Sequence, residues 1–219
     1  MASHSGQVLV MTSEQRSRTK FGWANGIALA ALVVAAVGFG FSVYERRDDR
    51  RSEQRKADHL AFEVGYNLGI QYACLHWSTA PARCQDDIWV RVAETLLEEL
   101  GGRPPIQAHD KSALISSCDE ISQFLVAMHG NEAADYFMLG RAVGNVHFAA
   151  GHRDDLTRGT NTEYVRLFDE GLVHVTVETN KLMKTLAPHI ELAPKHGGGV
   201  LQGEDVSTAL TQINEFFKN

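Results

Sequence analysis

The pattern of hydrophobic and polar positions divides the chain into one unbroken apolar stretch and a longer region with helical periodicity. The apolar stretch covers residues 21–44 and contains no charged residue. Twenty-four residues of helix extend over about 36 Å at about 1.5 Å per residue, which is enough to cross a bilayer. Trp23 and Tyr44 lie near its two ends, where aromatic side chains favour the membrane interface. We therefore predict a single transmembrane helix over residues 21–44, in contact with the lipid bilayer.

The segments on either side of this stretch are polar. Residues 1–20 form a polar tail, and residues 45–58 are rich in Arg, Glu and Asp without Gly or Pro. A cleaved signal peptide would have an apolar core of about 7–15 residues and a small-residue cleavage site, and neither is present. The pattern predicts an uncleaved anchor whose helix continues outward as a charged juxtamembrane stalk over residues 45–58.

The basic residues that flank the anchor bear on its orientation. Six of them follow the stretch and three precede it, and basic residues favour the cytoplasmic side. This count places the soluble domain in the cytoplasm, although acidic residues within the stalk leave the opposite orientation open. The preceding residues are Arg16, Arg18 and Lys20, and the following ones are Arg46, Arg47, Arg50, Arg51, Arg55 and Lys56.

The remaining residues, 59–219, are predicted to form an all-helical soluble domain. Apolar residues recur there at helical spacing, and no segment shows sustained alternation, so no sheet is expected. Asp110 is expected to cap the third helix. The six expected helices cover about residues 57–77, 86–100, 110–128, 132–150, 162–186 and 205–217.

Two motifs recur after a shift of 75 residues. A Phe-x-aliphatic-Gly-x-x-aliphatic-Gly motif covers residues 62–69 and again residues 137–144. An aromatic-Val-Arg-aliphatic motif covers residues 89–92 and again residues 164–167. The shared offset predicts an internal duplication, because two three-helix units packed together would bury apolar faces that each leaves open. The predicted pseudo-repeats cover about residues 59–128 and 132–217.

Four glycines of the first motif stand inside predicted helices, namely Gly65, Gly69, Gly140 and Gly144. A glycine inside a helix costs about 1 kcal/mol relative to alanine, so these positions indicate a close approach to the backbone. One interpretation is that the two glycine-bearing helices cross each other. The other is a ligand bound in a cavity beside the glycines.

Charged residues supply further candidates for binding. Arg91 and Arg166 occupy matched positions and would bind an anion together, or pair separately with acids on their own helices. Glu170, His174 and Glu178 recur every four residues, so they lie near one face of a helix. They are either metal ligands or a solvated polar stripe.

The chain has three cysteines, which cannot all pair with one another. Cys74 and Cys84 lie ten residues apart around Pro81, in a segment expected to join two helices. They would close a small disulfide in an oxidising compartment. Alternatively, all three cysteines, Cys118 included, are buried thiols that act as small apolar residues.

Charge and motifs narrow the function. Residues 57–219 carry a net charge of −10, which repels nucleic acid. Phosphate-binding loops, nucleophile elbows and zinc motifs are absent from the sequence, so it indicates no catalytic residues and no cofactor. We predict a membrane-anchored helical interaction or scaffold domain that binds a protein partner or forms a homo-oligomer. The alternative is a membrane-tethered sensory module that binds a ligand or a metal.

Overall fold

The computed structural model describes residues 49–78, 84, 88–102, 104–195 and 199–218. The chain divides into two units, Met1–Arg51 and Ser52–Asn219, and nearly all described residues belong to the second. The elements in these ranges are helical, with no strand among them, which confirms the predicted all-α class.

The helices match the predicted pattern with one addition. The segment expected to be a polar loop after the fourth predicted helix contains a short helix, α5, over Arg153–Thr157. We call the helix over residues 49–77 the first helix. The others are α2 (Ile88–Glu99), α3 (Lys111–His129), α4 (Asn131–Gly151), α5, α6 (Thr162–Leu186) and α7 (Gly203–Lys218).

Local capping sets the helix boundaries. The Asp110 carboxylate accepts a hydrogen bond from the Ala113 amide at 2.8 Å, which confirms its predicted role at the start of α3. Gly130 ends α3 and precedes α4 with a φ of 92°, a conformation that a residue with a side chain rarely adopts. Asn161 caps α6 by accepting from the Tyr164 amide at 2.8 Å.

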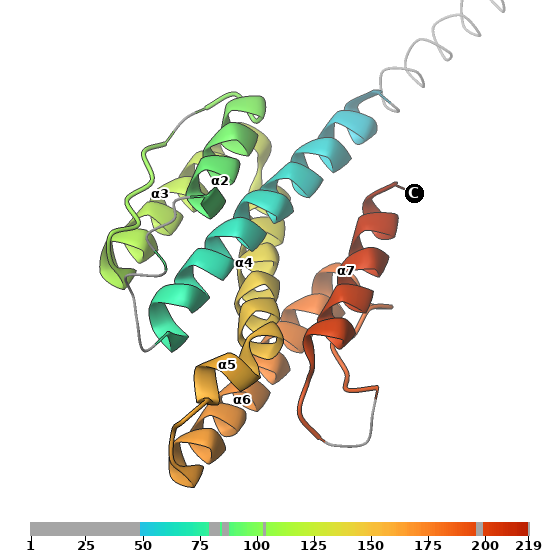
Figure 1. Cartoon of the computed structure of the whole chain (residues 1–219). Helices are drawn as coiled ribbons and strands as arrows, with labels where there is room; N and C mark the ends of the chain where they lie inside the picture. The colour runs from blue at the N-terminus through green and yellow to red at the C-terminus, as the bar shows by residue number, and fades with distance from the viewer. Residues whose placement is uncertain (1–48, 79–83, 85–87, 103, 196–198, 219) are drawn as a thin grey trace, which may run out of the picture. The chain divides into compact units, whose positions relative to one another are not determined.

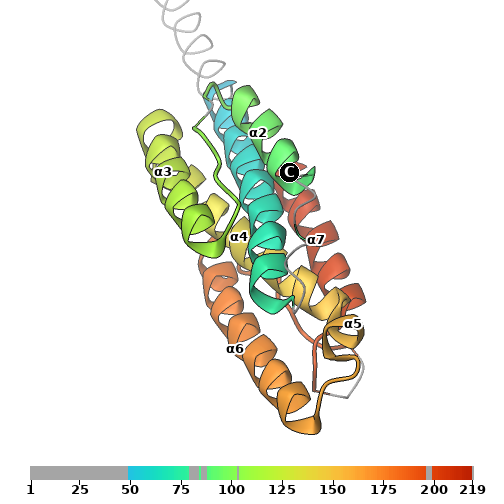
Figure 2. The same cartoon turned by 60° about the vertical axis from the view of Figure 1, so that its left-hand side comes forward.

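The first helix and α4 cross in direct backbone contact at their glycines (Figures 1 and 2). A Cβ atom built on Gly65 would lie 2.0 Å from the carbonyl oxygen of Phe137, and one on Gly140 would lie 2.0 Å from that of Phe62. The next pair repeats the arrangement, since Gly69 faces the Arg141 carbonyl group at 2.2 Å. No side chain fits at these positions, which is why glycine is needed there.

The contacts at this crossing are reciprocal. Gly65 meets Phe137 and Gly140 meets Phe62, and each partner lies 75 residues from its counterpart. Likewise, Gly144 meets the Tyr66 carbonyl oxygen at 2.1 Å, as Gly69 meets that of Arg141. Residues 75 positions apart are therefore equivalent with respect to the crossing.

Two hydrophobic cores lie on either side of the crossing. In Figure 1, α2 and α3 lie to the left of the first helix and α7 lies to its right. One core joins the first helix to α2 and α3, and the other joins α4 to α6 and α7. Phe62 packs into the core of α4, α6 and α7, whereas Phe137 packs into the core of α2 and α3. Each crossing helix thus sends one buried ring into the opposite core.

The predicted transmembrane helix, residues 21–44, lies outside the described residues. Within the part that the structure describes, no helix is both long and apolar enough to cross a membrane. The predicted stalk, residues 45–58, is described from residue 49 onward, where it is helical and mostly exposed until Ala57 and Asp58 become buried.

Candidate functional site: a cavity beside the helix crossing

The glycine faces themselves are filled by the backbone of the opposing helix. A cavity of about 360 Å³ lies further along the same two helices, beside Tyr66 and Ile70 of the first helix and His147 of α4. Such a volume is at the small end of the range for ligand pockets, about 300–1,000 Å³. The start of α2 and Cys84 complete the described part of its wall.

Gln71 is the most unusual residue of this wall. Its side chain is only 1% exposed, and its Nε2 donates a hydrogen bond to the Cys84 carbonyl oxygen at 2.9 Å. Its Oε1 atom is buried and has no hydrogen-bond partner among the described residues. A buried acceptor without a hydrogen-bond partner lowers the stability of a protein by about 1–3 kcal/mol.

A second polar pair lies in the same wall. The Tyr66 hydroxyl group forms a short hydrogen bond with Nδ1 of His147. Burial raises the pKa of Tyr66 to about 12 and lowers the pKa of His147 below its usual value. Both groups are therefore neutral near pH 7, and the tautomer of the imidazole sets which of the two donates the hydrogen bond.

Apolar and aromatic side chains form the rest of the wall. Trp89 and Ile88, at the start of α2, are large hydrophobic residues that remain 37% and 52% exposed beside the cavity. At the end of α4, the ring of Phe148 stacks on the ring of His152, with the two ring centroids 4.4 Å apart. Aromatic faces at the edge of a small cavity suit a flat apolar ligand.

A disulfide between Cys74 and Cys84 closes one side of the cavity. Their Cα atoms lie 5.7 Å apart, and the bridge encloses a loop with a sequence separation of 10. This pairing fixes Cys84, whose carbonyl oxygen binds Gln71. Cys118 is the free cysteine among the described residues, and burial raises the pKa of its thiol to about 11.

The residues 75 positions away along the chain differ in chemistry from the wall of the cavity. Val146 stands 75 positions after Gln71 and Ala149 stands 75 positions after Cys74, and both are fully buried and apolar. At the same offset from Tyr66 and His147, Arg141 and Tyr72 place the guanidinium 5.6 Å from the ring centroid.

The other sequence candidates are dispersed over the surface. Arg91 lies exposed on α2, whereas Arg166 lies on α6 and pairs with Glu163 and Glu170 of its own helix. Glu178 pairs with Lys181 at 2.6 Å. Arg166 is thus paired with acids of its own helix, as the second interpretation expected, and two members of the predicted metal stripe form ion pairs.

The prediction of a metal site at Glu170, His174 and Glu178 is not supported by the geometry. No group of three or more His, Cys, Asp or Glu side chains in the described ranges is placed to hold a metal ion. The three residues share a helix face, and within the described part of the chain no further acid, histidine or cysteine is grouped with them. A structural metal site requires about four ligands.

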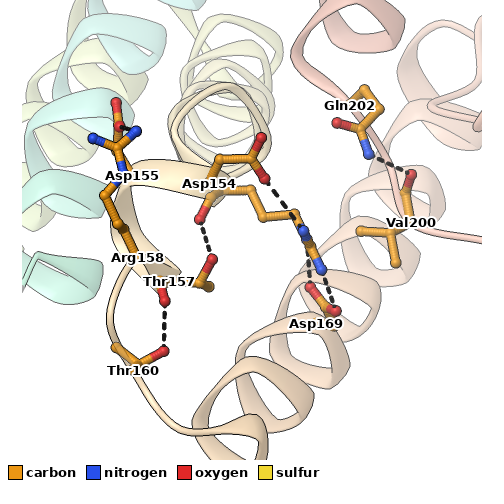
Figure 3. A network of polar contacts seen from close by, with 9 residues as sticks. Asp154, Asp155, Thr157, Arg158, Thr160, Asp169, Val200 and Gln202 are labelled. Atoms are coloured by element: carbon orange, nitrogen blue, oxygen red, sulfur yellow. Dashed lines mark hydrogen bonds and ion pairs between the residues drawn. The ribbon is translucent and has the colours of Figure 1, made fainter.

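Ion pairs and hydrogen bonds stabilise the turn between α5 and α6 (Figure 3). Arg153 donates two hydrogen bonds to the Asp169 carboxylate, both at 2.7 Å, and Arg158 pairs with Asp155. Thr157 and Thr160 add hydrogen bonds to backbone carbonyl oxygens. These contacts fix the short helix α5 against α6.

Sequence reasoning did not find Tyr66, Gln71 or His147. A glutamine or histidine on an amphipathic helix is usually a surface residue. Gln71 is instead buried with its amide bonded to the Cys84 carbonyl oxygen, and Tyr66 and His147 are half-buried. The nearest signal was the glycine motif, which marked the right pair of helices. Comparison of the chain with protein-family models, curated proteins and solved structures finds no match.

Proposed function

We propose that the chain is a membrane-tethered sensory module that binds a small molecule in the cavity beside the helix crossing. The observation that carries this proposal is the cavity itself, whose described wall combines the rings of Trp89 and Phe148 with the hydrogen-bonded pair Tyr66 and His147. Pockets that bind small molecules are mostly apolar and contain a few placed polar groups.

The domain that carries the site is proposed to have arisen by internal duplication. The reciprocal glycine contacts and the exchanged rings of Phe62 and Phe137 support this proposal. Ala93 and Leu97 of α2 also match Phe168 and Leu172 of α6 in burial, at the same offset of 75. In this view the two halves share a scaffold, and one side acquired the cavity.

The tether is proposed to be the apolar stretch over residues 21–44, with the domain in an oxidising compartment. The count of flanking basic residues favoured the cytoplasm. The disulfide between Cys74 and Cys84 argues for the opposite side, because such bonds persist in secreted and envelope compartments and are rare in the cytosol. The bias set by basic residues has exceptions, so the disulfide takes precedence.

Ligand binding is tested by thermal denaturation of the full-length chain in detergent, with a panel of neutral one-ring and two-ring compounds. A compound present at a hundred times its Kd stabilises by about 2.7 kcal/mol, or about 5–10 °C for a domain of this size. Gly151 lines the cavity, and a Cβ atom there would meet nothing within 4 Å. Gly151→Leu is therefore expected to fill the cavity and abolish the shift.

The matched control is Gln123→Leu, which adds the same side chain to an exposed position on α3. It should respond to ligand as the wild type does. If no compound raises the melting temperature, or if Gly151→Leu responds equally, the cavity is not a binding site.

Orientation is tested with Ser207→Cys, since Ser207 lies exposed on α7. The paired Cys74 and Cys84 and the buried Cys118 should not react with a membrane-impermeant maleimide. Intact cells should then label the variant and leave the wild type unlabelled. Labelling only after lysis would place the domain in the cytoplasm and contradict the proposal.

A scaffold role is the second candidate, favoured by the outer face of α6. Leu167, Val173 and Val177 are about half exposed there, although large hydrophobic side chains on soluble domains are usually more covered. If α6 binds a second copy, sedimentation of the full-length chain should show a dimer that Val173→Glu dissociates. A monomer at all concentrations would exclude this form of the scaffold role.

A further inference from the structure

Two acidic side chains are buried among the described residues, and their surroundings differ. Asp205 accepts hydrogen bonds from the backbone amides of Lys195 and Gln202, which tie a loop to the start of α7. Asp58, at the end of the stalk, is 4% exposed and accepts a hydrogen bond from the side chain of Gln54. The role of Asp205 is therefore structural, whereas that of Asp58 depends on what surrounds this second contact.

Gln54 joins Asp58 to the corner between α3 and α4. Its Nε2 amine donates a hydrogen bond to Oδ1 of Asp58 at 2.8 Å and another to the backbone carbonyl oxygen of His129 at 3.1 Å. His129 lies in the last turn of α3, and its own Nε2 atom is 2.8 Å from the carbonyl oxygen of Leu100. Residues 52–58, which belong to the same unit as this corner, are thus held against it through one side-chain amine.

The titratable groups around Asp58 come from both helices of the corner. Glu132 lies in the first turn of α4, and its negative charge opposes the ionisation of Asp58. His129 of α3 favours this ionisation when its imidazole is protonated. Tyr136 of α4 is 6% exposed, and burial raises its pKa to about 12, so its hydroxyl group stays neutral. Glu132 therefore acts in the same direction as burial, against a second negative charge at this corner.

Burial is the largest influence on Asp58 and raises its pKa from the usual value of 3.8 to about 6. If the end of the stalk left the corner, water would surround the carboxyl group and restore the usual pKa. The proton is then bound more tightly in the closed form, so the contact is strongest below about pH 4 and weakens as the pH rises to about 6. Over this range the released form gains about a hundredfold relative to the closed form.

We propose that Asp58 and Gln54 form a proton-controlled latch, which holds the end of the stalk on the α3–α4 corner while the carboxyl group is protonated and releases it when the proton is lost. A protonated carboxyl group keeps an oxygen that accepts from Gln54. Ionisation instead leaves a buried negative charge near Glu132 with a neutral amide as its donor.

The latch goes beyond ligand binding, because neither Asp58 nor Gln54 is among the described residues that line the cavity. It makes the attachment of the stalk respond to the acidity of the compartment that the domain faces. Failure of the latch would therefore leave the proposed binding site untouched, and the converse also holds.

The test is hydrogen–deuterium exchange of the full-length chain in lipid nanodiscs, followed by mass spectrometry from pH 4.5 to pH 7.5. Protection factors correct for the effect of pH on intrinsic exchange. In the wild type, protection of residues 52–60 should fall about tenfold between pH 5 and pH 7.5, with most of the fall complete by about pH 6.5. It should also stay below the protection of residues 137–146, which form the helix crossing in α4.

Asp58→Asn removes the charge and keeps an oxygen that accepts from Gln54, so its protection over residues 52–60 should not change with pH. The matched control is Asp119→Asn, the same substitution at an exposed position of α3, and it should retain the tenfold fall. A wild type without a fall, or Asp58→Asn with the same fall, would overturn the latch. Equal protection of residues 52–60 and 137–146 at every pH would also overturn it, because the stalk end would then leave only when the domain unfolds.

Discussion

The helix crossing makes a sharp prediction about stability, because its close contacts are with backbone atoms. A Cβ atom on Gly65 would lie 2.0 Å from the Phe137 carbonyl oxygen and 2.9 Å from the Arg141 amide nitrogen. No rotamer change relieves a contact with backbone, so the two helices would have to separate by about 1 Å. Overpacking of this kind costs about 1–3 kcal/mol, occasionally more.

The net effect of Gly65→Ala follows from two opposing contributions. Alanine gains about 1 kcal/mol in helix propensity, and the clash lies at or above the upper end of the overpacking range. We therefore expect a net loss of about 2 kcal/mol, or about 4–8 °C in melting temperature. Because the contacts are reciprocal, Gly140→Ala should lose a similar amount.

The assay is thermal denaturation of the full-length chain in detergent, followed by circular dichroism at 222 nm. Gly151→Ala is the matched control for stability, because it is the same substitution at a helical position where a Cβ atom meets nothing within 4 Å. It should leave the melting temperature unchanged or raise it slightly. A Gly65→Ala variant as stable as the wild type would refute the close crossing.

Three further predictions concern other contacts of the same domain. Replacing Cys74 and Cys84 together by serine should cost about 2.5 kcal/mol, from the entropy of a ten-residue loop, and dithiothreitol should destabilise the wild type but not this variant. Trp77→Phe removes the hydrogen bond that Nε1 donates to the Asn145 side chain at 3.0 Å, and it should lower the free energy of unfolding by about 1 kcal/mol. In a double-mutant cycle followed by urea denaturation, adding Asn145→Ala to this variant should cause no further loss. Burial raises the pKa of Asp58 from 3.8 to about 6, so the folded chain holds this proton more tightly and loses stability as pH rises through about 4–6. Asp58→Asn should accordingly gain up to about 3 kcal/mol over the wild type between pH 4 and pH 7, and a constant difference across that range would contradict the assignment.

The sequence predicted the helices well because each carries a local signal. Periodic apolar positions marked α3 and α6, and Asp110 marked the start of α3. The glycines marked the crossing, because a helix tolerates their cost only where something approaches closely. The helix α5 was not predicted, since a five-residue helix between polar residues has no periodicity to distinguish it from a loop.

The cavity depends on contacts between distant residues, which the sequence pattern does not reveal. Gln71 is buried because Cys84 and α4 cover it, and Tyr66 meets His147 across 81 residues. The pairing of Cys74 with Cys84 was one of two interpretations that spacing alone left open. The segment after α6 behaves similarly, since Asn180 holds Leu192 through both of its backbone groups.

The most direct test of the binding site is a crystal structure of the full-length chain grown with a compound that raises its melting temperature. Density for this compound is expected in the cavity beside Trp89 and Phe148, together with an intact bond between Cys74 and Cys84. A cavity filled by protein side chains, or the compound bound elsewhere, would contradict the proposed function.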